Sequence, residues 1–480
     1  MNIVIVGGGT AGWISAFFIA KAQPNKHKIT VIESSKIGII GAGEGSTGSM
    51  IDLLNGSFFD FKVDLKKFID NTDATFKMGI RHENWSPHMD SYFAPLDASP
   101  TGYTLDDYIF KHVLCNQDRK NIHLASEIGI KYENKNYSTP YALHFDGHKV
   151  GKYFKSLCLV DNIEFIDSVV EDVNLDTTGN IQSLTLEDRV LDGDFFIDCT
   201  GFSRVLMKKL GVGWKSYDDV LSLNTAMPFL INYKEGEKII PETKATALSS
   251  GWMWNIPLST RRGCGYVFDS RYISKEDAKK EVETYLGRSV EPIKWIEFTS
   301  GHSETFWKNN ALCLGLASSF VEPLEATSIH NTIIQTAIFV KEFLELDKEK
   351  TISNINQTVY NERITFLNKL TIDFISLHYQ GGRDDTPFWK NIKDNEKFTV
   401  TAKKIFKLAK HRIPGYVDIE GMYGSYSMPL VNWIYAGMGI YNLGQAERDL
   451  NRFDNILGAK IQYEKFYNQI SHTKPYISYG

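Results

Sequence analysis

The sequence predicts an α/β fold built on a doubly wound sheet, with a mainly helical C-terminal portion. The first sign is an apolar run at 3–6 that leads through a glycine-rich turn into a helical stretch and a second apolar run. That order of strand, turn, helix and strand opens a doubly wound sheet. The second sign is the chain beyond residue 351, which has few strand signals. We therefore expect an α/β body over 1–345 and a mainly helical portion, packed on that body, over 346–480.

The individual elements follow from their apolar patterns. Short apolar, β-branched runs are typical of buried parallel strands, whereas apolar residues gathered on one side of a 3.6-residue repeat indicate a helix. Pro24 sets the end of the first helix, because a proline stops helical backbone before it. On these grounds we expect strands at 3–6, 29–32, 192–198 and 311–316, and helices at 11–22 and 328–346.

Composition narrows the function classes. A chain of 480 residues, 42% of them hydrophobic, can bury a substantial core, and a net charge of -5 offers no basic surface for nucleic acid. Five scattered cysteines without a C-x-x-C pair argue against a disulfide scaffold or zinc, and twelve histidines form no H-E-x-x-H, so we expect no metal. Neither a signal peptide nor an apolar run of roughly 18 residues is present, so a soluble, cytoplasmic protein without a membrane partner is expected.

A glycine motif follows the first strand. Residues 7–12 match G-x-G-x-x-G, in which the first glycine makes a tight turn, the second admits a pyrophosphate and the third lets helix and strand pack. The pyrophosphate then faces the free N–H groups of the helix, and an acid ending the second strand binds the ribose hydroxyls. The motif predicts a dinucleotide site without separating FAD from NAD. The expected cofactor residues are Gly7, Gly9, Thr10, Ala11, Gly12 and Glu33.

Two further segments have distinctive composition. The first reads W-x-W-x-I-P over 252–257, and its tryptophans, two residues apart, share a face if the segment is a strand that the proline ends. The alternative is an ordinary core strand with a tryptophan pair. The second places Lys77 in a largely apolar stretch over 74–85. The alternative for Lys77 is a surface lysine on an edge strand, since lysine is rarely buried.

A third segment, 315–329, leads from a strand through a turn of small residues into a helix. Free N–H groups at such a turn suit an anion. The segment contains Pro323, Leu324 and Glu325 in succession. The alternative for Glu325 is a carboxylate that only faces the positive end of the helix dipole.

Together these segments resemble the flavin-dependent tryptophan halogenase family. The W-x-W-x-I-P block is complete, and the lysine and P-L-E segments stand in the expected order. Residues 41–47 look like the family's second glycine-rich cofactor segment, and 197–201 look like its later FAD-contacting turn. The stretch 378–389 is similar to the family's C-terminal part. The similarity runs from residue 1 to at least about residue 440.

The resemblance implies a flavin-monooxygenase-like FAD-binding box, in which the doubly wound sheet adjoins a substrate sheet. It also implies FAD, taken as FADH2 from a separate flavin reductase, together with oxygen and a halide. The halide becomes hypohalous acid, which reaches an electron-rich aromatic such as an indole through an internal passage. Further cofactor contacts are implied at Gly43, Glu44, Ser46, Thr47, Asp198, Gly201 and Gly315.

The resemblance also implies roles for the reacting residues. Lys77 is expected to hold the halogen, either as hypohalous acid bound to its ammonium or as a haloamine on its amine, and Glu325 is the carboxylate beside it. The halide is expected near the backbone N–H groups of Thr327 and Ser328. The barrier between flavin and substrate is expected to consist of Trp252, Trp254, Ile256 and Pro257.

Some features depart from the family pattern or leave alternatives. After Glu325 the chain has Ala326-Thr327-Ser328, where many members have serine, threonine and glycine, so chloride, bromide and iodide all stay open. No residue set that clamps free tryptophan is evident, and another indole, a phenol or a different electron-rich ring is an open substrate. A flavin hydroxylase, which usually has Gly-Asp at Gly315-Leu316, and an inactive FAD-binding protein are the alternative functions. The oligomeric state is also open.

Overall fold

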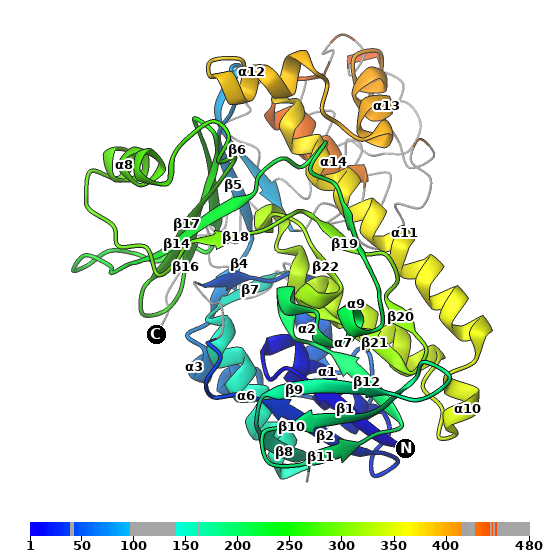
Figure 1. The fold of residues 1–480 in the computed structure, drawn as a ribbon. Helices are drawn as coiled ribbons and strands as arrows, with labels where there is room; N and C mark the ends of the chain where they lie inside the picture. Colours follow the sequence, from blue (N-terminus) through cyan, green and yellow to red (C-terminus); the bar gives the residue numbers. More distant parts are fainter. Residues whose placement is uncertain are drawn as a thin grey trace, which may run out of the picture.

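The computed structural model describes residues 1–38, 43–96, 141–161, 163–414, 418, 428–441, 444 and 447–448. Its first layer is a six-stranded sheet with the strand order β20-β21-β12-β1-β2-β8 (Figure 1). All neighbours are parallel except β20 and β21, so the carboxyl ends of the central strands meet at one edge. The strands are β1 (Asn2–Val6), β2 (Lys28–Glu33), β8 (Glu164–Asp167), β12 (Phe195–Asp198), β20 (Trp307–Lys308) and β21 (Ala311–Cys313).

Helix α1 (Thr10–Ala22) packs between this sheet and two further helices, α6 (Gly147–Val160) and α9 (Thr327–Glu342). Its side chains are buried on nearly every side, because sheet and helices enclose it. Such an all-round apolar helix belongs to the interior of a large domain. This layer therefore forms the core under the glycine motif.

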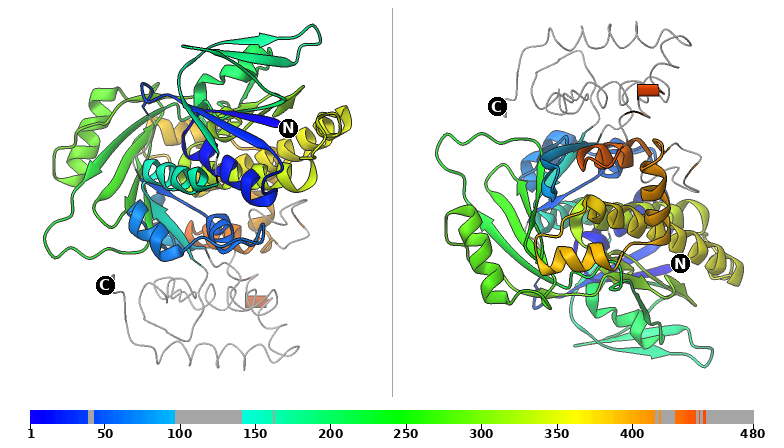
Figure 2. Two further views of the ribbon diagram at one scale, coloured as in Figure 1. Left: turned by 90° about the horizontal axis from the view of Figure 1, so that it is seen from below. Right: turned by 90° about the horizontal axis from the view of Figure 1, so that it is seen from above.

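The second layer is a seven-stranded sheet with the order β18-β14-β17-β16-β15-β5-β6, antiparallel except where β15 pairs with β5. Met253 packs on the side of α8 (Lys275–Leu286), whereas Trp252, Trp254 and Ile256 face the C-terminal helices. Figure 2 shows α8 and those helices on opposite faces of this sheet. The strands are β5 (Gly79–Ser86), β6 (Met89–Pro95), β14 (Thr225–Ile231), β15 (Thr243–Leu248), β16 (Gly251–Pro257), β17 (Arg262–Phe268) and β18 (Ile296–Glu297).

A small sheet, with the order β3-β7-β4, lies between the two layers (Figure 1). Its strands are β3 (Glu44–Gly45), β7 (Ala142–Phe145) and β4 (Thr75–Lys77). The other short strands are β9 (Val170–Leu175), β10 (Ile181–Leu186), β11 (Val190–Asp192), β13 (Trp214–Ser216), β19 (Gly301–Ser303) and β22 (Ser319–Phe320). The other body helices are α2 (Gly48–Asn55), α3 (Leu65–Thr72), α7 (Val205–Lys209), η2 (Gly201–Ser203), η3 (Gly315–Ala317) and η4 (Pro323–Glu325).

The described part of the chain after residue 345 is helical, as expected. Its long helix α11 joins both layers. Tyr360 and Ile364 lie in the core of the six-stranded sheet, and Ile372 and Ile375 lie in the core beside the seven-stranded sheet. A division of the chain at residue 345 stays a prediction. The helices are α10 (Lys348–Thr351), α11 (Asn354–His378), η5 (Tyr379–Gly381), α12 (Pro387–Asp394), α13 (Val400–Ala409) and α14 (Met428–Gly437).

The predicted α/β fold is confirmed, and β1, β2 and α1 match their predicted ranges to within a residue. The strand expected at 192–198 begins only at Phe195, because 190–192 pair with β10 in another sheet. The strand expected at 311–316 ends at Cys313, since Gly315 turns into η3 with a φ of +63°. The last predicted helix, 328–346, already ends at Glu342.

The described ranges contain no helix long and apolar enough to cross a membrane. The cysteines in the described parts of the chain are unpaired, and Cys115 lies outside them. The unpaired cysteines are Cys158, Cys199, Cys264 and Cys313.

Candidate active site

The turn between β1 and α1 has the geometry that the glycine motif requires. Gly7 has a φ of +109°, and a Cβ on Gly12 would lie 1.9 Å from the Gly7 carbonyl oxygen, so no larger residue fits at Gly12. Helix α1 has no side-chain cap at Gly9, and a Cβ there would meet nothing within 4 Å. Free N–H groups with open space before them fit a pyrophosphate.

Glu33 ends β2 beside this turn, as predicted. Its Oε2 accepts hydrogen bonds from Trp13 Nε1 at 3.2 Å and from Lys155 Nζ at 2.9 Å. Both contacts fall on the same oxygen, and among the described residues nothing hydrogen-bonds Oε1. The carboxylate is thus held in place with one oxygen left for the ribose hydroxyls, and this half of the site fits a dinucleotide.

The neighbouring strand ends bring the other predicted cofactor residues to the same edge. Asp198 is buried, and its two oxygens accept hydrogen bonds from Thr200, Leu206 and Met207. Asp198 therefore stabilises the turn after β12, which contains Gly201. Gly315 follows β21, and a Cβ there would lie 2.6 Å from Ala11 Cβ, so this turn packs directly on α1.

The second glycine-rich segment is described from Gly43 onward, whereas Gly41 and Ala42 lie outside the described residues. Burial, with help from the charge of Asp146, raises the pKa of Glu44 to about 7. The Ser46 hydroxyl and N–H bond the backbone of Leu143 in β7. The Thr47 hydroxyl caps α2 and hydrogen-bonds His330 Nδ1 at 3.0 Å. These hydroxyls therefore hold the segment between β7 and α9.

Lys77 is a buried lysine with only 1% of its surface exposed, so the surface-lysine alternative is excluded. Its Nζ donates a hydrogen bond to the Ser46 carbonyl oxygen at 3.0 Å. A Cβ on Gly45 would lie 3.3 Å from this Nζ and 3.5 Å from Ala326 Cβ, so Gly45 lies between the two. Burial lowers the pKa of Lys77 from 10.5 to about 8, against the opposing charge of Glu325.

Glu325 lies in η4 and is hydrogen-bonded to His378, a histidine for which the sequence predicted no role. Its Oε1 is 2.8 Å from Nε2 of His378, whose Nδ1 is 3.0 Å from the Phe374 carbonyl oxygen. The histidine is fully buried and Glu325 is 8% exposed. A left-handed residue, Ala326 with φ +56°, separates η4 from α9. Glu325 is thus directed toward His378, and it lies in η4, before the first turn of α9.

A second buried carboxylate, Glu322, was not predicted. Its Oε1 accepts hydrogen bonds from Trp252 Nε1 at 3.0 Å and from the Tyr379 hydroxyl. Burial raises the pKa of Glu322 to about 7. The sequence does contain a signal for these contacts. Two acids lie three residues apart in V-E-P-L-E, and His378 and Tyr379 are adjacent; His378 hydrogen-bonds Glu325, and Tyr379 hydrogen-bonds Glu322.

The W-x-W-x-I-P block forms strand β16, with both tryptophans on one face as predicted. The ring centroids of Trp252 and Trp254 are 6.3 Å apart, and Trp85 lies 6.4 Å from Trp252. At the strand's end, the Thr75 hydroxyl donates to the Pro257 carbonyl oxygen at 2.6 Å. Since Thr75 precedes Lys77 by two residues on β4, this bond ties the tryptophan strand to the lysine strand.

His82 completes the buried cluster. Its ring stacks on Tyr92 at 4.7 Å, and its Nε2 lies 4.0 Å from Glu325 Oε1, too far for a hydrogen bond. Burial lowers the pKa of His82 well below its ordinary value, so the ring is neutral. In the described part of the chain, His82, Glu325 and His378 are the one group whose ligand atoms could hold a metal ion. A metal would have to displace the bond between Glu325 and His378.

The predicted halide position lies at the start of α9. Thr327 is buried, and its hydroxyl makes no hydrogen bond within the described residues. The helix begins without a side-chain cap, so the N–H groups of Thr327 and Ser328 are free to face an anion. The position thus has the chemistry that a halide needs.

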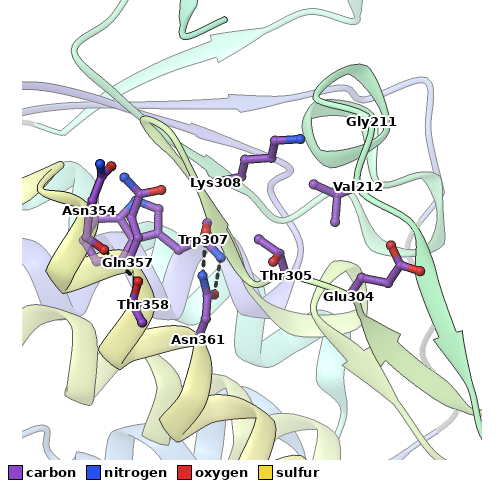
Figure 3. A pocket seen from close by; sticks show the side chains of 10 residues that line it. All are labelled: Gly211, Val212, Glu304, Thr305, Trp307, Lys308, Asn354, Gln357, Thr358 and Asn361. Carbon is purple, nitrogen blue, oxygen red and sulfur yellow. Dashed lines mark hydrogen bonds between the residues drawn. The ribbon is translucent and has the colours of Figure 1, made fainter.

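A separate pocket, drawn in Figure 3, contains none of the predicted site residues. Its polar side chains hold neighbouring loops. Asn361 Oδ1 accepts from the N–H groups of Phe306 and Trp307, and Lys308 Nζ donates to the Leu210 carbonyl oxygen. We therefore assign this pocket no catalytic part.

A strand edge that fits a dinucleotide, together with a buried cluster of one lysine, two carboxylates and two tryptophans, is the arrangement expected of an enzyme with a nucleotide cofactor. The tryptophan halogenase family model matches residues 2–447. The 7-chloro-L-tryptophan 6-halogenase KtzR of Kutzneria sp. (strain 744) is 32% identical over 82% of this chain and 81% of its own. The chain belongs to the tryptophan halogenase family, whose members are flavin-dependent halogenases.

Solved structures agree with this assignment. A tryptophan halogenase from Shewanella frigidimarina NCIMB 400 superposes with a TM-score of 0.83 at 26% identity, covering 95% of this chain and 93% of the other. BrvH, a flavin-dependent halogenase from Brevundimonas sp. BAL3, gives a TM-score of 0.83 at 25% identity and covers 98% and 97%. The resemblance seen in the sequence is confirmed. The roles of the individual residues stay predictions.

Proposed function

We propose that this halogenase uses FADH2, oxygen and a halide to form hypohalous acid, and that Lys77 and Glu325 direct the halogen onto an electron-rich aromatic ring such as an indole. The observation that carries the proposal is Lys77, a buried amine beside Glu325 with a pKa of about 8. Lysine is rarely fully buried, and ionisable groups with strongly shifted pKa values cluster at functional sites.

The proposed FAD site lies along the carboxyl edge of the six-stranded sheet. The uncapped start of α1 would hold the pyrophosphate, and Glu33 would hold the ribose. The segment 43–47 and the turns at Gly201 and Gly315 would line the rest. When bound and reduced, the flavin supplies the electrons with which oxygen converts halide to hypohalous acid.

The lowered pKa of Lys77 keeps both of its proposed chemistries available. With a pKa near 8, about one lysine in ten is neutral at pH 7, compared with about one in three thousand at the ordinary pKa. The ammonium form can donate a hydrogen bond to hypohalous acid, and the amine form can become a haloamine. In either case the halogen is held at a fixed atom, which favours reaction at one ring carbon.

Glu325 is proposed to accept the proton that the ring loses. Electrophilic attack leaves a cationic ring, and a carboxylate beside it stabilises that charge and then takes the proton. Its direct bond to His378 supports a role that depends on proton position. Thr327 and Ser328 are proposed to bind the halide at the start of α9.

The tryptophan strand is proposed to separate the cofactor from the substrate. Trp252, Trp254, Ile256 and Pro257 are bulky or stiff, and the first three lie in the core shared with the C-terminal helices. The bond from Trp252 to Glu322 supports a fixed wall, because it holds the indole ring in one orientation. These residues are proposed to block and guide, without forming bonds to the substrate.

The supply of reduced flavin is proposed to come from a separate NADH-dependent reductase. The one dinucleotide motif that we identified, at 7–12, is assigned to FAD, so a partner must deliver the electrons. The unpaired cysteines support a reducing, cytoplasmic compartment.

The test is product formation measured by mass spectrometry. Purified protein is supplied with FAD, a flavin reductase, NADH, oxygen and catalase, with chloride, bromide or iodide, and a panel of indoles, phenols and pyrroles. A halogenated product is expected from the wild type and not from Lys77→Ala. A hydroxylated product without halogen would contradict the proposal, and equal product from the variant would show that free hypohalous acid reacts in solution.

A further inference from the structure

The hydrogen-bonding pattern of His378 defines where its protons lie. Its Nδ1 is 3.0 Å from the Phe374 carbonyl oxygen, which can only accept, so Nδ1 carries a hydrogen. Its Nε2 is 2.8 Å from Oε1 of Glu325. A neutral imidazole with hydrogen on Nδ1 has only a lone pair on Nε2, so this contact also needs a proton.

That proton can sit on either partner. Glu325 can be the acid that donates to a neutral imidazole, or His378 can be the imidazolium that donates to a carboxylate. In both forms the pair holds one exchangeable proton between Nε2 and Oε1. The second oxygen of Glu325, Oε2, takes no part in this bond.

We infer that His378 is a positioning residue that lets Glu325 accept the ring proton, an inference that rests on the proposed halogenation. After the halogen adds, the ring C–H bond breaks, its electron pair returns to the ring, and its proton goes to Oε2 of Glu325. The shared proton is then held fully on Nε2 of His378. Glu325 ends as a neutral acid and His378 as an imidazolium, and the ring has exchanged one proton for one halogen.

The other groups around the pair do not replace His378. Lys77 on β4 faces Glu325 as a cation or an amine and donates its bond to Ser46. His82 on β5 lies 4.0 Å from Oε1. Tyr92 on β6 is buried, and Glu322 in the loop before η4 is bound by Trp252 and Tyr379. Among the described side chains, His378 is the one that hydrogen-bonds Glu325.

The matched variant is His378→Gln. Its side-chain amide N–H can still donate to Oε1 and hold Glu325 in place, but an amide does not take up a proton near neutral pH. The probe is indole, compared with ring-deuterated indole, with bromide, FAD and a reductase. His302→Gln is the control, because His302 is another buried histidine with Nδ1 2.7 Å from the Ser303 carbonyl oxygen and Nε2 3.2 Å from the Tyr217 hydroxyl.

We expect wild type and His302→Gln to brominate both indoles at the same rate. His378→Gln is expected to form product about 10²-fold more slowly, the usual contribution of a group that handles a proton. It should also brominate deuterated indole more slowly than ordinary indole, because breaking the ring C–H bond becomes the slow step. A purely structural defect would lower both rates equally and give no isotope effect.

A second measurement serves if His378→Gln folds poorly, which FAD binding would reveal. It is the isotope effect of Glu325→Gln, whose amide N–H can still donate to Nε2 of His378 but which cannot accept the ring proton, and we expect this isotope effect to match that of His378→Gln. A folded His378→Gln or Glu325→Gln without an isotope effect overturns the inference. Absence of any brominated indole or other aromatic from the wild type would instead contradict the proposed function itself.

Discussion

The proposed nucleotide site at 7–12 and the buried cluster of Lys77, His82, Glu322, Glu325 and His378 are built in opposite ways. The proposed nucleotide site consists of backbone, because a turn of consecutive residues at 7–12 and the uncapped start of α1 would form its surface. The buried cluster consists of ionisable side chains brought together from β4, β5, η4 and α11. A backbone site follows from local sequence, whereas a side-chain site depends on tertiary packing.

The two regions also differ in what they cost the fold. The glycine turn at 7–12 buries no charged side chain, and its Gly7 N–H donates to the Ile32 carbonyl oxygen of β2 at 2.8 Å. The buried cluster holds Lys77, Glu322 and Glu325 away from water, and burial disfavours the charged form of an ionisable group. Substitution in the glycine turn should therefore weaken cofactor binding, because it changes the shape of the turn. Substitution in the buried cluster should slow the reaction and can raise the free energy of unfolding, because it removes a buried ionisable group.

The largest expected effect is at Gly12. In Gly12→Val the new Cβ would lie about 1.9 Å from the Gly7 carbonyl oxygen, so the turn must distort. We expect FAD to bind at least about a thousandfold more weakly, a loss of about 4 kcal/mol or more. Flavin fluorescence titration measures this, with Gly38→Ala as the control, since a Cβ there meets nothing within 4 Å. Unchanged affinity in Gly12→Val would separate the glycine motif from the cofactor.

The next effect concerns Glu325. Glu325→Gln keeps the size of the side chain but removes its basic oxygen, so we expect halogenation to slow by about 10²-fold with some activity left. FAD binding should be unchanged, because Glu325 lies in the buried cluster and outside the proposed FAD site. Steady-state product formation checks this, and a variant as fast as the wild type would remove Glu325 from the chemistry.

A smaller effect concerns stability and its dependence on pH. Because the pKa of Lys77 is lowered from 10.5 to about 8, the folded state disfavours its charge; this penalty is full below pH 8 and fades as the pH rises toward 10.5. Lys77→Met should therefore raise the free energy of unfolding at pH 7 by up to ~3 kcal/mol, and by less at pH 10.

Urea unfolding of the FAD-free protein at pH 7 and pH 10 measures this change. The control is Lys244→Met, which removes a half-exposed lysine paired with Glu83 and should change stability by less than about 1 kcal/mol. If Lys77→Met destabilises the fold at pH 7, Lys77 does not carry the burial penalty assigned to it.

The smallest expected effect is that of metal removal. The ligand atoms of His82, Glu325 and His378 lie close together, but Glu325 and His378 already share a hydrogen bond. We expect halogenation to be the same after dialysis against EDTA. A loss of activity that Zn²⁺ or Fe²⁺ restores would show that this cluster binds a metal in the working enzyme.

The sequence predicted the nucleotide end well because its signals are local. Strand, glycine turn and helix follow each other within 2–22, and the structure matches them to within a residue. Lys77, Glu325 and the tryptophan strand were found through their resemblance to a family. Their shared burial agrees with that resemblance, and their roles stay predictions.

Other features were not predictable, for physical reasons. The contacts of His378 with Glu325 and of Tyr379 with Glu322 join residues more than 50 positions apart, and no periodic pattern encodes such pairs. Strand β21 is shorter than predicted because Gly315 is left-handed, and α9 ends four residues early because of local packing. A pairing of two nearby acids with two adjacent polar aromatic residues is the pattern to seek in related sequences.

The central claim is that Lys77 carries the halogenation while the flavin chemistry proceeds elsewhere. The most direct test measures FADH2 oxidation and halogenated product together in wild type, Lys77→Met and the control Lys244→Met, with catalase present. The account predicts that all three oxidise FADH2 at similar rates and that only Lys77→Met forms no product. Product from Lys77→Met, or loss of its flavin oxidation, would contradict the account.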